Sequence, residues 1–170
     1  MIGVIIAAVV IAIVIIVGGI MIAGRSSYEA PIQYVVEGMN KGDAEIILKA
    51  LPIKEFKKAA KQDADLFDGM DEEEVYNFLI SMMNETIRYF REDYVGDINL
   101  DYKIYGKEKL DEDDLEWIQE DYADLNIKVD DAYSVDVELI VESGDETESE
   151  RDDVVVVKIG GKWYMDISSF

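Results

Sequence analysis

Carboxylates and tyrosines are the side chains of this sequence that could do acid–base or cation chemistry. The chain has 38 Asp and Glu, 10 Tyr, no His and no Cys. A carboxyl–tyrosine pair can act as a base and an oxyanion donor. The lack of His and Cys excludes a thiol nucleophile, the usual hydrolytic triad and nearly all transition-metal sites. We therefore expect no cofactor and assign no catalytic residue.

The acidic stretch from Asp63 to Glu74 comes nearest to a calcium loop. Its acids fall at template positions 1, 3, 9 and 12, but Phe67 occupies position 5 and Asp68 takes the glycine position. A helix stop, a glycine turn and a capping box that begins at Asp71 explain this stretch better. The acidic segments 110–126 and 143–153 are typical of solvated surface. We expect no metal site.

The charge balance limits the possible partners. The formal net charge is −22, and a chain this acidic is repelled by phosphate, so a nucleic-acid partner is not expected. Residues 26–170 have the usual size of one domain and are enough to bury a core. We expect one domain there, with a protein or a small molecule as its partner.

Residues 1–25 are predicted to form a membrane anchor. Ile2–Gly24 is a run of 23 residues without a charged side chain, and as a helix it is about 34 Å long, enough to cross a hydrocarbon core of about 30 Å. A cleaved signal peptide would need a basic start and a shorter apolar core. We expect residues 2–24 to bind the bilayer as a single-pass span. Arg25, taken alone, places the domain in the cytoplasm by the positive-inside rule.

Four helices are expected after the anchor. Apolar residues recur at helical spacing in 28–40, 43–51, 53–67 and 71–94. Gly42 is a predicted helix stop, Asp43 an N-cap, and Asp71 with Glu74 a capping box. The fourth helix should be the longest, with this apolar stripe: Val75, Phe78, Leu79, Met82, Ile87, Phe90, Tyr94.

The period then changes to two, which predicts antiparallel strands at 98–106, 132–142 and on both sides of Gly160-Gly161. The segment 143–152 is interpreted as a polar hairpin tip, and 115–125 as a short helix. On the last strand Trp163 has the phase to face the helices and Tyr164 to face away. Helices followed by a sheet predict an α+β fold in which the helices cover one sheet face.

This order resembles a known family. "YEAPIQYVVEGMNKGDAEIILKALP", a long helix and a sheet that ends in "VKIGGKWYMDI" are similar to the nuclear transport factor 2-like, cystatin-like α+β cone, and within it to membrane-anchored envelope domains of Gram-positive bacteria. The resemblance covers most of residues 28–168. It implies a curved antiparallel sheet, an extracytoplasmic domain and a ligand surface at the mouth of the cone. No catalytic motif of the enzymes that share this fold matches here.

We therefore predict a membrane-tethered, extracytoplasmic binding or interaction domain without catalytic activity, whose ligand surface is the mouth of the cone or the acidic face. Tyr34, Tyr89 and Trp163 are the candidate ligand-binding residues, because large aromatics would line the cone. Trp117 falls beside the buried stripe of its helix, where an exposed aromatic among acids would contact a partner. Two alternatives stay open. One is a small cone-pocket enzyme with a carboxyl–tyrosine pair, and the other an acidic cation- or partner-binding domain that faces the cytoplasm.

Overall fold

The computed structural model describes residues 27–62, 69–94 and 97–167, so the predicted span at 2–24 lies outside the described residues. None of the helices in the described ranges is both long and apolar enough to cross a bilayer. The elements, in chain order, are α2 (Ala30–Lys41), α3 (Ala44–Leu48), α4 (Ile53–Gln62), α5 (Glu72–Glu92), β1 (Ile98–Lys109), α6 (Glu112–Ala123), β2 (Asp131–Ser143), β3 (Glu146–Ile159) and β4 (Lys162–Met165).

The α2–α3 hairpin follows the predicted stop and cap. Gly42 ends α2 with a φ of 66°, in the left-handed region that glycine adopts without strain. Asp43 then caps α3, because its carboxylate accepts hydrogen bonds from the backbone N–H groups of Glu45 (2.9 Å) and Ile46 (3.3 Å). The two helices approach closely at Gly38, where a Cβ would lie only 2.4 Å from Cγ1 of Ile47.

The predicted capping box begins α5. The carboxylate of Asp71 accepts from the N–H groups of Glu73 and Glu74, and that of Glu74 accepts from the N–H of Asp71 at 2.9 Å. With 21 residues α5 is the longest described helix, as predicted. Of the predicted stripe, Val75, Leu79, Ile87 and Phe90 are buried, whereas Phe78, Met82 and Tyr94 are only partly so, and Met83 is buried in addition.

The sheet is antiparallel, in the order β1-β2-β3-β4. On residues 99–103 of β1 and 134–142 of β2, buried residues alternate with partly buried or exposed ones, as the period of two predicted. The prediction for 143–152 was wrong: only the turn at Gly144-Asp145 is a tip, and β3 begins at Glu146, paired with Ser143. Residues 146–153 are exposed on both faces, so no apolar alternation marks them, and pairing with β2 is what makes them a strand.

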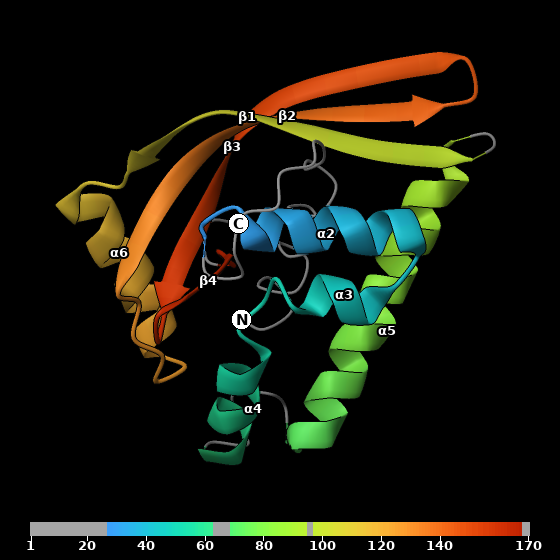
Figure 1. Cartoon of the computed structure of the whole chain (residues 1–170). Helices are drawn as coiled ribbons and strands as arrows, with labels where there is room; N and C mark the ends of the chain where they lie inside the picture. The colour runs from blue at the N-terminus through green and yellow to red at the C-terminus, as the bar shows by residue number, and fades with distance from the viewer. Residues whose placement is uncertain (1–26, 63–68, 95–96, 168–170) are drawn as a thin grey trace.

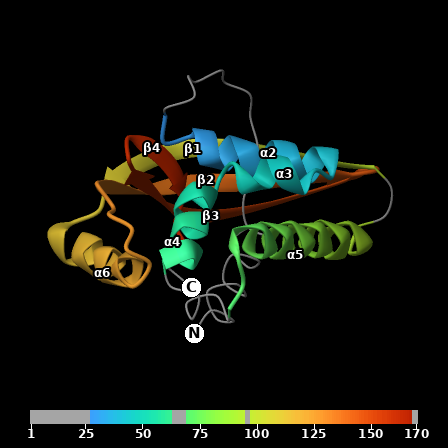
Figure 2. The ribbon, with the colours of Figure 1, turned by 90° about the horizontal axis from the view of Figure 1, so that it is seen from below.

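Helices pack against this sheet, and the fold is α+β as predicted. Figures 1 and 2 show α2 and α3 side by side, with α5 next to them and α6 at the opposite end of the sheet from the β2–β3 turn. Asn40 joins α2 to β1, since its side-chain amide donates to the carbonyl of Leu100 (2.9 Å) and accepts from the N–H of Leu100 (2.8 Å). Arg91 of α5 donates to the carbonyls of Met39 and Asn40 at the end of α2.

Candidate functional site

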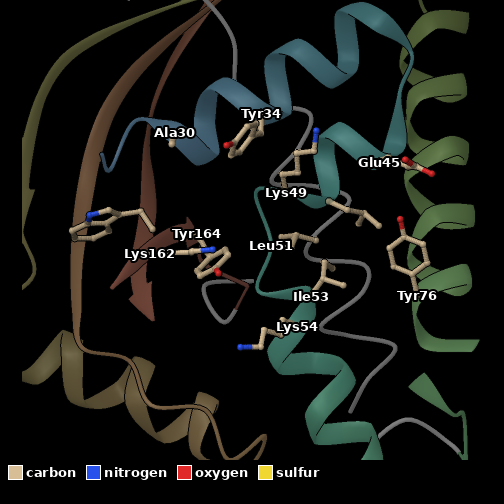
Figure 3. A pocket seen from close by; sticks show the side chains of 12 residues that line it. Ala30, Tyr34, Glu45, Lys49, Leu51, Ile53, Lys54, Tyr76, Lys162 and Tyr164 are labelled. Carbon is tan, nitrogen blue, oxygen red and sulfur yellow. The ribbon is translucent and has the colours of Figure 1, made fainter. Parts of the chain in front are cut away.

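A hollow of about 520 Å³ lies between α2, the α3–α4 region and the β3–β4 hairpin, and it contains two of the predicted ligand residues. Figure 3 shows it with α2 above, α4 below, the strands on the left and α5 on the right. We call it the lysine pocket. Its lining consists of three lysines, four aromatic residues, one carboxylate and four aliphatic residues: Lys49, Lys54, Lys162, Tyr34, Tyr76, Trp163, Tyr164, Glu45, Ala30, Leu48, Leu51 and Ile53.

The β3–β4 turn brings β4 to this pocket. Gly160 and Gly161 both have positive φ, 55° and 82°, which a tight turn needs and glycine permits. The backbone N–H of Met165 donates to the carbonyl of Ala50 at 2.8 Å, so β4 lies along the connection between α3 and α4. Both Trp163 and Tyr164 border the hollow at this edge. The expectation that Tyr164 faces away from it was therefore wrong.

Trp163 borders the pocket, and its neighbours hold its indole in place. It stacks on the ring of Tyr133, with centroids 4.9 Å apart and planes inclined by 22°. The ammonium of Lys158 lies 5.7 Å from the centroid of the indole, within cation–π range. These neighbouring side chains therefore fix the orientation of the Trp163 indole.

The three lysines come from the end of α3, from α4 and from β4, and none has an ion-pair partner among the described residues. In the part of the chain that the structure describes, seven Lys and Arg side chains pair with carboxylates: Lys41, Lys61, Arg88, Lys103, Lys109, Lys128 and Arg151. Three further lysines lie over aromatic rings: Lys57, Lys107 and Lys158. None of these contacts involves Lys49, Lys54, Lys58 or Lys162. All of these four except Lys58 line the lysine pocket.

Tyr164 gives the pocket a hydroxyl that stays protonated at neutral pH. Partial burial raises the pKa of Tyr164 above its ordinary value, and the carboxylate of Glu55 raises it further. A protonated phenol can donate a hydrogen bond to an anion. The donor adds to the three ammonium groups, and all four favour a negatively charged group in the hollow.

The other two predicted site residues lie elsewhere. Tyr89 is 55% exposed on α5, with its hydroxyl 3.3 Å from a carboxylate oxygen of Glu85 on the same helix, and it does not line the lysine pocket. Trp117 is 58% exposed on α6, in the surface position that the sequence predicted. No contact in the described residues gives either side chain a ligand, so their roles stay predictions.

Carboxyl–tyrosine pairs occur at other places in the fold. Tyr105 donates to Glu138 at 2.6 Å on the exposed face of the sheet. Tyr122 hydrogen-bonds to Asp166, and burial raises the pKa of the Tyr122 phenol well above its ordinary value. Tyr122 and Asp166 are only 1% and 2% exposed, respectively. A substrate therefore has no access to that pair, which acts as a buried structural contact.

The structure bears on the predictions about metal ions. Within the described ranges, no group of three or more Asp and Glu is arranged to hold a metal ion. Half of the calcium-loop stretch, residues 63–68, lies outside these ranges.

Two aromatic residues of the lysine pocket, Tyr34 and Trp163, were predicted from the sequence. Its lysines were missed, because they come together only in the folded chain. One signal was the basic helix at 53–62, in a chain that is otherwise acidic. No protein-family model, curated protein or solved structure matches this chain.

Proposed function

We propose that this chain is a membrane-tethered, extracytoplasmic binding domain without catalytic activity, and that the lysine pocket holds an anionic ligand with an apolar or aromatic part. The observation that carries the proposal is the convergence of Lys49, Lys54 and Lys162 on one hollow, without partners among the described residues. Of the other lysines in the described ranges, only Lys58 has neither an ion pair nor an aromatic ring beside its ammonium group.

The charge distribution supports an anion over a cation. The formal net charge of −22 repels anions from most of the surface. The lining of the pocket contains three lysines and a single carboxylate, that of Glu45, so the local sign of the charge is reversed. An anion that binds there also relieves the mutual repulsion of the lysines.

The aromatic lining supports an apolar part in the ligand. Trp163, Tyr34, Tyr76 and Tyr164 border the hollow together with four aliphatic side chains. A volume of about 520 Å³ lies within the range of about 300–1,000 Å³ for small-molecule sites. The pocket therefore suits a phosphate or carboxylate on a hydrophobic body better than a bare inorganic ion.

The hydrogen bonding of the pocket tyrosines favours binding over catalysis. Among the described residues, no hydrogen bond joins a carboxylate to the hydroxyl of Tyr34, Tyr76 or Tyr164. The tyrosines of the pocket therefore form no base–donor pair with a described carboxylate, which is the arrangement that a cone enzyme with a carboxyl–tyrosine pair would use.

The predicted anchor would keep this pocket near a bilayer. Ala30 lines the pocket and follows Gly24, the end of the apolar run, by six residues. Six extended residues reach about 20 Å. The anionic group could then belong to a lipid headgroup or to a soluble molecule. The resemblance to envelope domains supports the outer side, although Arg25 alone favours the cytoplasmic side.

The fluorescence of Trp163 can report ligand binding in the test. The chain has 2 Trp, so Trp117→Phe, at an exposed position, leaves Trp163 as the single indole. The full chain in nanodiscs of phosphatidylcholine is titrated with phenyl phosphate, inorganic phosphate and phenyltrimethylammonium, and Trp163 emission is followed. We expect saturable change with phenyl phosphate, weaker change with inorganic phosphate and none with the cation.

A second arm separates the two sources of the anion. In nanodiscs that contain phosphatidylglycerol, a lipid ligand would shift Trp163 emission before any probe is added and would compete with phenyl phosphate. If the ligand is a soluble molecule, the titration of Trp163 emission with phenyl phosphate should be the same in both lipids. A response to the cation alone, or to no anionic probe in either lipid, would contradict the proposal.

A further inference from the structure

The distal half of β3 has an open edge. β2 pairs with β3 along its whole length, from Asp131 opposite Lys158 to Ser143 opposite Glu146, whereas β4 pairs only with Val156–Ile159. No other described strand lies beside residues 146–155. Figure 1 shows this part of the β2–β3 hairpin extending well beyond β4. Such an edge exposes backbone donors and acceptors that can pair with another strand.

The hydrogen bonds show which backbone groups face this edge. The carbonyl of Lys158 accepts from Asp130, next to β2, and that of Val155 accepts from Asp166, next to β4. Alternate residues of a strand direct their N–H and C=O groups to opposite edges. Residues 147, 149, 151 and 153 therefore face outward, and the N–H of Asp153 bonds to the carboxylate of Asp152 at 2.8 Å. The outward backbone N–H and C=O groups of Thr147, Ser149 and Arg151 are therefore available to pair with a partner strand.

The acidic side chains beside this edge fall on one face. Glu148, Glu150 and Asp152 lie opposite Val141, Leu139 and Val137, three buried residues of β2. They form no ion pair within the described ranges, and we call them the acidic row. On the opposite face the one basic residue of this part of β3, Arg151, pairs with Asp136 through two nitrogens.

Two hollows next to the acidic row have apolar walls. One of about 620 Å³ is lined by Tyr94, Val141 and Glu148, and the other, of about 550 Å³, adds Phe90 and Glu150. Partial burial raises the pKa of the Tyr94 phenol, and the carboxylate of Glu148 raises it further. The stems of long cationic side chains fit such a combination of aromatic wall and carboxylate rim.

From the open edge and the acidic row together, we propose that β3 is a docking strand for an extended cationic segment of a partner protein. The segment pairs with the backbone of Thr147, Ser149 and Arg151 by strand addition. Its Lys or Arg residues fall at every second position, on the face of the acidic row. A second copy of this chain is disfavoured, because its own β3 edge would bring carboxylates against carboxylates.

Two peptides of equal composition separate strand pairing from simple charge attraction. One alternates lysine with threonine over about nine residues, the span that the open edge accommodates. The other carries the same lysines in one block, followed by the threonines. Affinity for the full chain in uncharged detergent micelles is measured by fluorescence anisotropy. We expect the alternating peptide to bind about tenfold tighter or better.

Variants of the edge test the backbone and the charges separately. Ser149→Pro removes one outward N–H without touching the ladder to β2, and Ser149→Ala is its matched control. We expect about a tenfold loss of alternating-peptide affinity for Ser149→Pro and little change for Ser149→Ala. Glu148→Gln with Glu150→Gln should also weaken binding, whereas Glu116→Gln with Glu120→Gln on α6 should not.

Circular dichroism and urea midpoints confirm that each variant is folded. Equal affinity for the two peptides, or full binding by a folded Ser149→Pro chain, would overturn the proposal. Failure here leaves the lysine pocket untouched, since the two sites share no residue.

Discussion

Trp163 lies against Tyr133, with the two ring planes inclined by only 22°. Tyr133 in turn meets Tyr28 edge-on, with centroids 6.0 Å apart, and Lys107 lies 4.0 Å from the Tyr28 centroid and 4.3 Å from that of Tyr133. Trp163, which borders the lysine pocket, is thus the end of an aromatic row.

Trp163→Ala should lower the free energy of unfolding by about 1–3 kcal/mol. The indole is partly buried, so the loss should be smaller than the 3–5 kcal/mol typical of a fully buried tryptophan. Trp117→Ala, at a side chain that is 58% exposed, should change it by less than about 0.5 kcal/mol. Urea unfolding measures both. Equal losses for the two variants would mean that the stack does not hold Trp163.

Gly38→Ala should cost about 2 kcal/mol or more. The new Cβ would lie 2.4 Å from Cγ1 of Ile47 and 2.8 Å from the carbonyl oxygen of Asp43, so α2 and α3 must separate. Gly106→Ala is the matched control, because nothing lies within 4 Å of its added Cβ. A Gly38→Ala chain as stable as the Gly106→Ala chain would show that the helices are not in close contact.

Stability should fall as the pH rises from about 10 to about 12. Burial, with a smaller contribution from Glu29, raises the pKa of Tyr102 from 10.0 to about 12. The unfolded chain releases this proton near pH 10 and the folded chain only near 12, so stability is complete below pH 10 and is lost between these values. Tyr102→Phe should show a smaller loss between pH 9 and 11.5 in urea unfolding. The exposed Tyr89→Phe should behave like the parent.

The predicted anchor at 2–24 has its own test. We expect the chain to remain in the membrane fraction after a carbonate wash, with residues 26–170 open to protease added outside intact cells. Digestion only after lysis would refute the outward topology. Release of a chain that begins near Arg25 would identify a cleaved signal peptide.

Local chemistry explains why the helix ends were predictable. The bonds of Asp43 and of the Asp71–Glu74 box join residues at most three apart in the chain, so their residue types alone indicate them. The apolar faces of β1 and β2 follow a period of two for the same reason. Residues 146–153 carry no such pattern. The strand there depends on its partner β2, and the sequence provided no sign of it.

The pocket was predictable only in its aromatic half. Tyr34 and Trp163 are large amphipathic side chains on elements whose phases could be read from the sequence. Lys49, Lys54 and Lys162 are far apart in the chain or on different elements, and their convergence depends on the contact between β4 and Ala50. Tyr89 was predicted by the same reasoning as Tyr34, but its side chain is 55% exposed on α5.

The most direct measurement compares two triple variants of equal charge by calorimetry with phenyl phosphate. One changes Lys49, Lys54 and Lys162 of the pocket to Gln, and the other changes Lys41, Lys58 and Lys128, which do not line it. If the pocket is the anion site, the first variant should lose at least about tenfold in affinity while the second keeps that of the parent. Equal losses in the two variants, or none in either, would contradict the account.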